Sequence, residues 1–339
     1  MKKRVLLVAM LQLFMVLGGC SSDSGNDSSS VDKQKITADY VADVASTSDF
    51  VISNDNRVYL YGEKDFELKE IDLTGKVTSL KAFRDANFLN SRLSISKTGE
   101  IFLISPESDL NKDKIFRFEN NFKELNIFYT MKPVSSPFAT KIKLTSIAEN
   151  KDNTYFVYDF NNKQMKRFIP ELNGDVFVAG SEKREIKDGT GLNAGFSIVT
   201  KILSQNNVLY LIDNFDPGNS EKSFSSNIRK LEYVNNEWKV TTLLSSTTET
   251  FIDLAFDSKN EFYVLIKDKG ISKLNLQSNT LSAFKEGQFE VRKENHFYGF
   301  PSKDIQSMKI KGDDIYITYA NYLIKISDFQ TKFAAAEKK

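Results

Sequence analysis

The chain has 339 residues with 46 basic and 45 acidic side chains, and this balance excludes the concentrated positive charge that nucleic-acid binding requires. A single cysteine and a single histidine exclude a disulfide within the chain, a multi-cysteine thiolate site and a zinc site built from several histidines. Phenylalanine (27) and tyrosine (13) are abundant and proline (6) is scarce, which favours β-strands over other elements.

The N-terminal residues have the layout of a signal peptide. A basic stretch, Met1 to Arg4, precedes an apolar run from Val5 to Gly19 in which Gln12 is the only strongly polar residue. The run is shorter than the roughly 20 residues that a membrane-spanning helix needs. We therefore expect residues 1–19 to be a signal peptide that is removed.

The apolar run ends in Leu17-Gly18-Gly19-Cys20, which resembles the lipobox of bacterial lipoproteins. The resemblance implies cleavage before Cys20 and attachment of lipid to its thiol, so that the protein is anchored to a membrane. Residues 20–35 are rich in serine and have the composition of a flexible tether. Ser21 rather than aspartate follows Cys20, which favours the outer membrane over the inner one. The alternative is an ordinary secretory peptide in which Cys20 is incidental.

An internal repeat follows the tether. Six segments share a turn-like residue followed by an alternating apolar strand that carries an aromatic residue near its start. These aromatics are Tyr59, Phe102, Phe156, Tyr210, Tyr263 and Tyr316, and they are separated by 43, 54, 54, 53 and 53 residues. Such a series is the signature of a repeat architecture.

Each repeated strand has a strand-like companion before it and another after it, and a fourth is present in five of the six units. Four antiparallel strands per unit predict a six-bladed β-propeller over residues 36–330. The last unit lacks its fourth strand, and we expect the segment 36–46 to supply it and close the ring. Residues 331–339 are predicted to be a polar tail. A β-sandwich or two stacked barrels are the alternatives, because they also contain short strands at regular spacing.

One stretch resembles the NHL repeat. It runs through Val176-Phe-Val-Ala-Gly-Ser181, Asp188-Gly-Thr-Gly191, Ala194 and Phe196, and then through Tyr210-Leu-Ile-Asp213 and Asn227-Ile-Arg-Lys230. The next unit towards the N-terminus has a weaker copy in Asp159, Asn162 and Met165. The full pattern covers one repeat of six, and its implied fold is again a six-bladed β-propeller.

Three polar residues of this stretch, Asp188, Asp213 and Asn227, are candidate ligand-binding residues. Turn chemistry is the alternative interpretation, because Asp and Asn hydrogen-bond their own turns and glycine permits positive φ. Asp213 and Asn227 should bracket a hairpin that is enlarged by residues 214–226.

Catalytic motifs are absent from the sequence. His296 lies in a polar segment and is predicted to be a solvent-facing loop residue, and no Gly-x-Ser-x-Gly nucleophile motif is present. Carboxylates from different blades can nevertheless converge at the mouth of a propeller, and oxygen ligands alone can hold calcium. No catalytic residue or metal ligand is assigned.

The leading functional hypothesis is a membrane-anchored, non-enzymatic propeller of the bacterial cell envelope that holds a protein or glycan partner on one face. It needs no cofactor and is expected to be a monomer. One alternative is a calcium-dependent hydrolase of lactones or small esters. The other is a sensor or solute-capture lipoprotein that binds a small molecule in its central tunnel.

Overall fold

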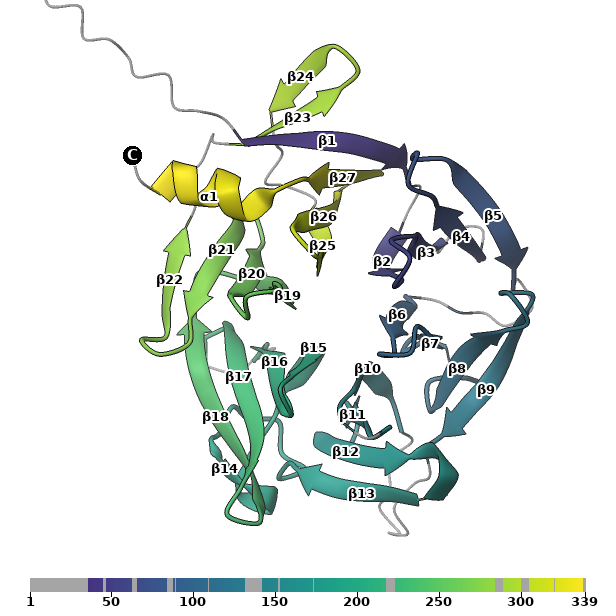
Figure 1. Ribbon diagram of the computed structural model, residues 1–339. Coiled ribbons are helices and arrows are strands. Elements are labelled where there is room, and N and C mark those ends of the chain that lie inside the picture. Colours follow the sequence, from purple (N-terminus) through teal and green to yellow (C-terminus); the bar gives the residue numbers. More distant parts are fainter. Residues whose placement is uncertain are drawn as a thin grey trace, which may run out of the picture. The chain divides into compact units, whose positions relative to one another are not determined.

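Six sheets follow one another around a central axis in the computed structural model (Figure 1). The structure describes residues 36–44, 47–62, 66–83, 88, 90–108, 110–131, 142–151, 153–172, 174–217, 223–283, 289–299, 305–319 and 321–337. The predicted signal peptide (1–19), Cys20 and the tether up to residue 35 lie outside the described residues. Within those described, no helix is both long and apolar enough to cross a membrane.

Each sheet is one blade, and its strands run from the centre outwards in chain order, with β1 as the outer strand of the sixth blade. The blades contain β2 (Thr47–Ile52), β3 (Val58–Gly62), β4 (Glu67–Ile71) and β5 (Val77–Ala82); β6 (Arg92–Ile95), β7 (Ile101–Ile104), β8 (Lys114–Glu119) and β9 (Glu124–Thr130); β10 (Leu144–Glu149), β11 (Tyr155–Asp159), β12 (Gln164–Ile169) and β13 (Gly174–Ala179); β15 (Ile198–Gln205), β16 (Val208–Phe215), β17 (Ser225–Val234) and β18 (Glu237–Ser246); β19 (Phe251–Phe256), β20 (Phe262–Ile266), β21 (Gly270–Asn275) and β22 (Thr280–Ala283); and β25 (Ile305–Lys311), β26 (Asp314–Tyr319), β27 (Tyr322–Ile326) and β1 (Ile36–Asp43). The predicted six-bladed propeller is thus confirmed.

The second strand of every blade carries the repeated aromatic residue, which confirms the predicted repeat. These strands are almost continuously buried, as in β3, β11 and β20, because neighbouring blades cover both of their faces. The hairpin before the second strand contains a residue with positive φ, such as Asn56, Gly99 or Asn260. Asparagine and glycine adopt this conformation at little cost, which explains the turn-like residue in the repeat.

The hydrophobic core is divided into six clusters, and each cluster joins two neighbouring blades. Each repeated aromatic lies in such a cluster. Phe102 packs edge-on against Tyr155 of the next blade with a centroid distance of 5.4 Å, and Phe156 packs against Trp238 at 5.1 Å. The repeated aromatic therefore supplies a contact at each boundary between blades. Such contacts are needed because an isolated blade cannot bury both of its faces.

The ring closes through β1, as the sequence predicted. This strand pairs antiparallel with β27, and Tyr40 lies opposite Ile324 in the register. The pairing joins the first and the last strands of the propeller without a covalent link, and it covers the outer edge of β27.

Two elements at the periphery were not predicted. A hairpin of β23 (Phe289–Lys293) and β24 (His296–Gly299) extends the sixth blade, with β23 parallel to β1. His296 is exposed, as predicted, but it lies on a strand and not in a loop. The prediction failed because the segment from Arg292 to His296 is polar, and the alternation before it covers only Phe289 and Val291.

The C-terminal segment 331–339, predicted to be a polar tail, instead contributes to a helix, α1 (Phe329–Glu337). Phe329 and Phe333 are buried against Tyr263 of the fifth blade. Residues four positions apart share one face of a helix, so this short apolar pair is sufficient to dock it.

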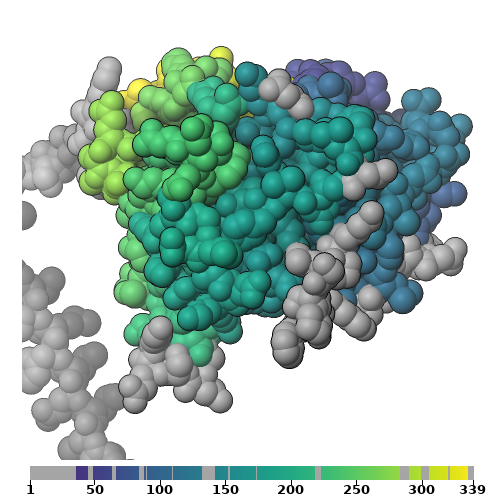
Figure 2. All heavy atoms as spheres, turned by 90° about the horizontal axis from the view of Figure 1, so that it is seen from below, coloured from purple at the N-terminus to yellow at the C-terminus, as the bar shows by residue number. Residues whose placement is uncertain are grey.

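The third and fourth blades meet around short irregular elements. These are β14 (Gly189–Thr190), which pairs with β18, and the 3₁₀ helix η3 (Gly191–Asn193). A second 3₁₀ helix, η2 (Pro170–Leu172), connects β12 and β13 within the third blade. Figure 2 shows this side of the molecule, where atoms coloured teal to green lie between blue atoms of the second blade and yellow-green atoms nearer the C-terminus.

Candidate functional site

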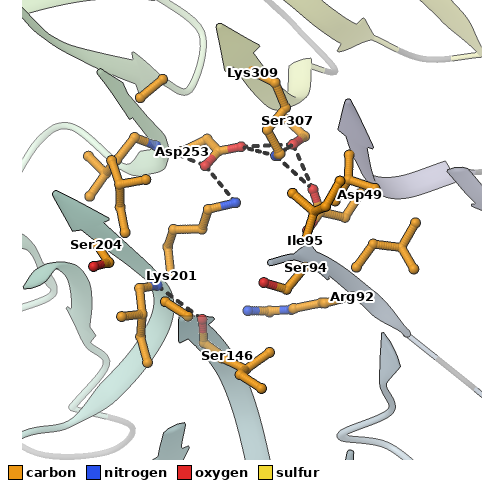
Figure 3. Close-up of a pocket in the computed structure, with 18 of the residues that line it drawn as sticks. Asp49, Arg92, Ser94, Ile95, Ser146, Lys201, Ser204, Asp253, Ser307 and Lys309 are labelled. Atoms are coloured by element: carbon orange, nitrogen blue, oxygen red, sulfur yellow. Dashed lines mark hydrogen bonds and ion pairs between the residues drawn. The ribbon is translucent and has the colours of Figure 1, made fainter. Parts of the chain in front are cut away.

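A cavity of about 600 Å³ lies at the centre of the ring and is lined mainly by the six innermost strands, β2, β6, β10, β15, β19 and β25. One side chain from each strand occupies an equivalent position, and we call this set the channel girdle. It consists of Asp49, Arg92, Ser146, Lys201, Asp253 and Ser307, all of which line the cavity. Lys309, two residues after Ser307 on β25, joins the girdle from the next position that faces the cavity (Figure 3).

The local backbone helps to place the girdle. In four blades the pairing of the inner strand with its neighbour shifts register immediately before the girdle residue, at Ser146, Lys201, Asp253 and Ser307. Such a bulge inserts one additional residue and redirects the side chains that follow it. The bulges thereby help to place polar side chains in the channel.

Two carboxylates and two ammonium groups form one network across the girdle. Lys309 Nζ lies 2.9 Å from Asp49 Oδ1 and 3.0 Å from Asp253 Oδ2, so that it bridges the first and fifth blades. Lys201 Nζ lies 2.9 Å from the other oxygen of Asp253. The hydroxyl of Ser307 lies within hydrogen-bonding distance of both carboxylates, 2.9 Å from Asp49 Oδ1 and 2.7 Å from Asp253 Oδ2.

The ionisation of these groups follows from the network. Burial by itself would raise the pKa of Asp49 and of Asp253, but Lys201 and Lys309 outweigh it, so both pKa values lie below their usual value. Burial would lower the pKa of Lys309, but Asp253 and Asp49 outweigh it and hold that pKa above its usual value. All three groups are therefore fully charged near neutral pH.

Arg92 enters the same space without a carboxylate partner among the residues that the structure describes. Its Nη1 donates to the carbonyl oxygen of Thr145 at 3.1 Å and to that of Thr200. Both carbonyls belong to the additional residue of a bulge, on β10 and β15. Burial lowers the pKa of Arg92, although an arginine in a protein remains charged.

The predicted candidates Asp188, Asp213 and Asn227 are brought together elsewhere, in the fourth blade, and none of them lines the central cavity. Arg229 joins the two carboxylates: its Nη1 lies 2.9 Å from Asp213 Oδ2 and its Nη2 lies 3.1 Å from Asp188 Oδ1. Asn227 Nδ2 donates to the backbone oxygen of Asp213 at 2.9 Å, across the predicted hairpin. A ligand-binding role for these three residues stays a prediction.

The contacts of these candidates give them a structural role. Asp213 accepts hydrogen bonds from the backbone of Ser197 and Ile198, and Asp188 accepts them from the backbone and hydroxyl of Thr242. The third blade repeats the arrangement, because Lys166 Nζ lies 3.0 Å from the buried Asp159 Oδ2. The polar residues of the NHL-like stretch thus fix loops and strands to one another.

Sequence reasoning missed the channel girdle, although a signal for it exists. Every girdle residue lies nine or ten positions before the repeated aromatic of its blade. The six positions carry different residue types, two acids, two bases and two serines, so no local motif marks them. Aligning the units on the aromatic places four of the six in one column, and Lys201 and Ser307 one position away from it.

The described residues contain no group of three or more His, Cys, Asp or Glu side chains placed to hold a metal ion. In the girdle, oxygens of Asp49 and Asp253 are occupied by ammonium groups. A calcium ion at this place would have to displace Lys309, because the ammonium group of Lys309 already bridges the two carboxylates.

Comparison with known proteins supports the architecture. No protein-family model matches the sequence, and no curated protein sequence matches it either. Similar solved structures include virginiamycin B lyase from Staphylococcus aureus, with a TM-score of 0.52 and 15% identity over 83% of this chain and 94% of that one. An auxiliary nutrient binding protein from Bacteroides thetaiotaomicron has a TM-score of 0.58 and 10% identity over 84% of this chain and 69% of that one.

A third similar structure, provisionally assigned as a gluconolactonase, has a TM-score of 0.57 and 10% identity over 86% of this chain and 91% of that one. Identities this low establish the propeller fold alone. The resemblance of one blade to the NHL repeat stays a prediction.

Proposed function

We propose that this protein is a non-catalytic binding propeller that takes a small solute, or the end of a glycan, into its central channel. The observation that carries the proposal is the ionic network of the girdle. A general acid or base needs a pKa near the working pH, whereas the pKa values of Asp49, Asp253 and Lys309 are driven away from neutrality. The network is suited to orienting a polar ligand.

The size and lining of the cavity favour a ligand over a flat protein partner. A volume of about 600 Å³ falls within the range of small-molecule sites, roughly 300–1,000 Å³. Apolar side chains such as Ile95, Ile202 and Leu203 line the cavity beside the polar girdle groups. A structure of similar fold is that of an auxiliary nutrient binding protein from Bacteroides thetaiotaomicron, which is in keeping with this proposal.

The N-terminal features extend the proposal to the cell envelope. Lipid on Cys20 and a tether over residues 20–35 would hold the propeller at a membrane, with the outer membrane favoured. Metabolic labelling with a palmitate analogue tests this point. The wild-type chain should incorporate label and shift to a shorter form, whereas Cys20→Ser should do neither; equal labelling of both would refute it.

A channel-blocking variant tests the binding function. Ser94 lines the cavity on β6, and Ser94→Trp would place a bulky side chain in the channel and narrow it. The matched control is Ser282→Trp, on the exposed outer strand of the fifth blade. We expect a panel of sugars, short glycans and organic acids to contain ligands that raise the melting temperature of the wild-type protein and of Ser282→Trp, but not of Ser94→Trp. Ligands that stabilise all three proteins equally would refute the channel as the site.

Calcium-dependent hydrolysis is the second candidate, favoured by the convergence of Asp49 and Asp253 on one cation in the channel. If calcium replaces Lys309 there, millimolar calcium will raise the melting temperature by several degrees and a chelator will reverse the effect. On the proposed binding function, calcium leaves the melting temperature unchanged, and chromogenic esters and lactones are not hydrolysed.

A further inference from the structure

The charges inside the girdle do not cancel. Asp49 and Asp253 contribute two negative charges, and Lys201 and Lys309, which contact them, contribute two positive charges. Arg92 adds one further positive charge. Asp49, Asp253 and Glu107 attract it from a distance, but within the described part of the chain none of them forms an ion pair with it. One positive charge therefore remains at the centre of the ring.

The guanidinium of Arg92 is held in place before any ligand arrives. Its Nη1 donates to the bulge carbonyls of Thr145 and Thr200, which lie on the next two blades. Figure 3 shows the nitrogen atoms of Arg92 and Lys201 pointing into the same open space at the centre of the girdle. Among the described residues, no hydrogen bond engages Nε or Nη2 of Arg92, so donors of its planar fork stay available.

Two hydroxyl groups lie beside the Arg92 guanidinium in the cavity. Ser146 accepts a hydrogen bond from the backbone N–H of Ile202 at 3.0 Å, which fixes its oxygen and leaves its proton to donate. Ser94 lines the cavity two residues after Arg92 on the same strand. A guanidinium, an ammonium and two hydroxyls thus converge from β6, β10 and β15.

The side chains that line the whole cavity also carry a net positive charge. Arg92, Lys97, Lys201, Lys309 and Lys311 face Asp49, Glu149 and Asp253, so basic residues outnumber acidic ones by five to three. A channel with walls of low dielectric concentrates such a field and attracts ions of the opposite charge. A partly buried cation without a counter-charge is unfavourable, and a bound anion would relieve this.

We infer that the channel binds its ligand through a single carboxylate group, which the Arg92 guanidinium holds and Lys201, Ser94 and Ser146 support. The inference rests on the proposed binding function and names its ligand class: an organic acid, an amino acid or an acidic sugar. The planar fork of arginine matches the two oxygens of a carboxylate. The one surplus positive charge of the girdle itself matches a monoanion, whereas a phosphate dianion would place a second negative charge beside Asp49 and Asp253.

The test uses acetate, the smallest carboxylate probe, and acetamide, its neutral counterpart of similar shape. Saturation-transfer NMR on the purified full chain should detect acetate at millimolar concentrations and not acetamide. Arg92→Gln should weaken acetate binding about tenfold or more, since charge-assisted hydrogen bonds are lost. Arg92→Lys, which keeps the charge and loses the fork, should give an intermediate result. The matched control is Arg57→Gln, an exposed arginine paired with Glu70, and it should bind as the wild type does.

Absence of an acetate signal from the wild-type protein, equal signals from acetate and acetamide, or full binding by folded Arg92→Gln would each overturn the inference. Hydrogen phosphate that displaces acetate more effectively than formate does, at matched ionic strength, would overturn the choice of carboxylate. The comparison of acetate with acetamide needs the wild-type protein alone, so it decides the matter even if the Arg92 variants fail to fold. Binding of neutral ligands that Ser94→Trp abolishes, without acetate binding, would leave the proposed function standing and refute only the carboxylate.

Discussion

Replacing Lys309 by methionine should destabilise the propeller more than any exposed lysine substitution. The ammonium of Lys309 contacts Asp49, Asp253 and Ser307 at 2.9, 3.0 and 2.7 Å, and the Asp253 side chain is only 3% exposed. Removing one partner of a buried ion pair costs about 3–5 kcal/mol. Because Lys201 still contacts Asp253, we expect the lower end, about 3 kcal/mol.

The expected shift in melting temperature follows from the size of the domain. Unfolding entropy of about 2.1 cal/mol/K per residue, over roughly 300 residues, converts about 3 kcal/mol into a decrease of about 5 °C. Calorimetry or thermal circular dichroism measures it. The matched control is Lys273→Met, because the pair of Lys273 with Glu261 is about one third exposed on both sides and should contribute less than about 1 kcal/mol.

Two further results would test the electrostatic explanation. Without Lys309, the pKa values of Asp49 and Asp253 should rise, so that the loss of stability shrinks as the pH falls towards 4 and a carboxylate takes up a proton. The double variant Lys309→Met with Asp253→Asn should recover part of the loss, because it removes one of the two carboxylates. A penalty equal to that of Lys273→Met, or one independent of pH, would refute the reasoning.

Three other outcomes are expected. Arg229→Met should cost about 3–5 kcal/mol in urea unfolding, because it leaves the fully buried Asp213 without its counter-charge; a loss below about 1 kcal/mol would contradict the structural role of the cluster. Because the pKa values of Asp49 and Asp253 are lowered in the folded state, their contribution to stability is present above pH ~4 and is lost as the pH falls through the folded-state pKa values. Urea unfolding from pH 7 to pH 2 should show this loss of stability in the wild-type protein and a smaller loss in Asp253→Asn. Gly180→Ala should destabilise the third blade by more than about 1 kcal/mol, because Gly180 has a φ of +129° and an added Cβ would collide with the backbone of Lys163. A melting temperature within 1 °C of the wild type, which corresponds to well under about 1 kcal/mol, would contradict this.

The blade structure could be predicted because local sequence patterns determine its strands and turns. Alternating apolar residues, a turn residue before each second strand and the spacing of Tyr59, Phe102 and their equivalents identify the strands and their number. The absent fourth strand of the last unit, together with the extra segment after residue 35, predicted how the ring closes. Hairpin β23–β24 and helix α1 were missed because each depends on docking against strands that are distant in sequence.

The candidate site could not be predicted in the same way. Asp49 and Asp253 are about 200 positions apart in the sequence, yet both contact one ammonium group, that of Lys309. Conversely, Asp188, Asp213 and Asn227 stood out as motif residues, and their contacts are those of a structural cluster around Arg229.

The sequence by itself determined the all-β architecture, the six repeated units and the closing strand, because hydrophobic periodicity and turn residues act over a few positions. Only the tertiary structure decided which side chains meet at the centre. Closure of the ring brings six inner strands around one axis, and bulges in four of them help to turn a particular side chain inwards. The resulting balance of charge around Arg92 is a property of that convergence, since no single blade contains it.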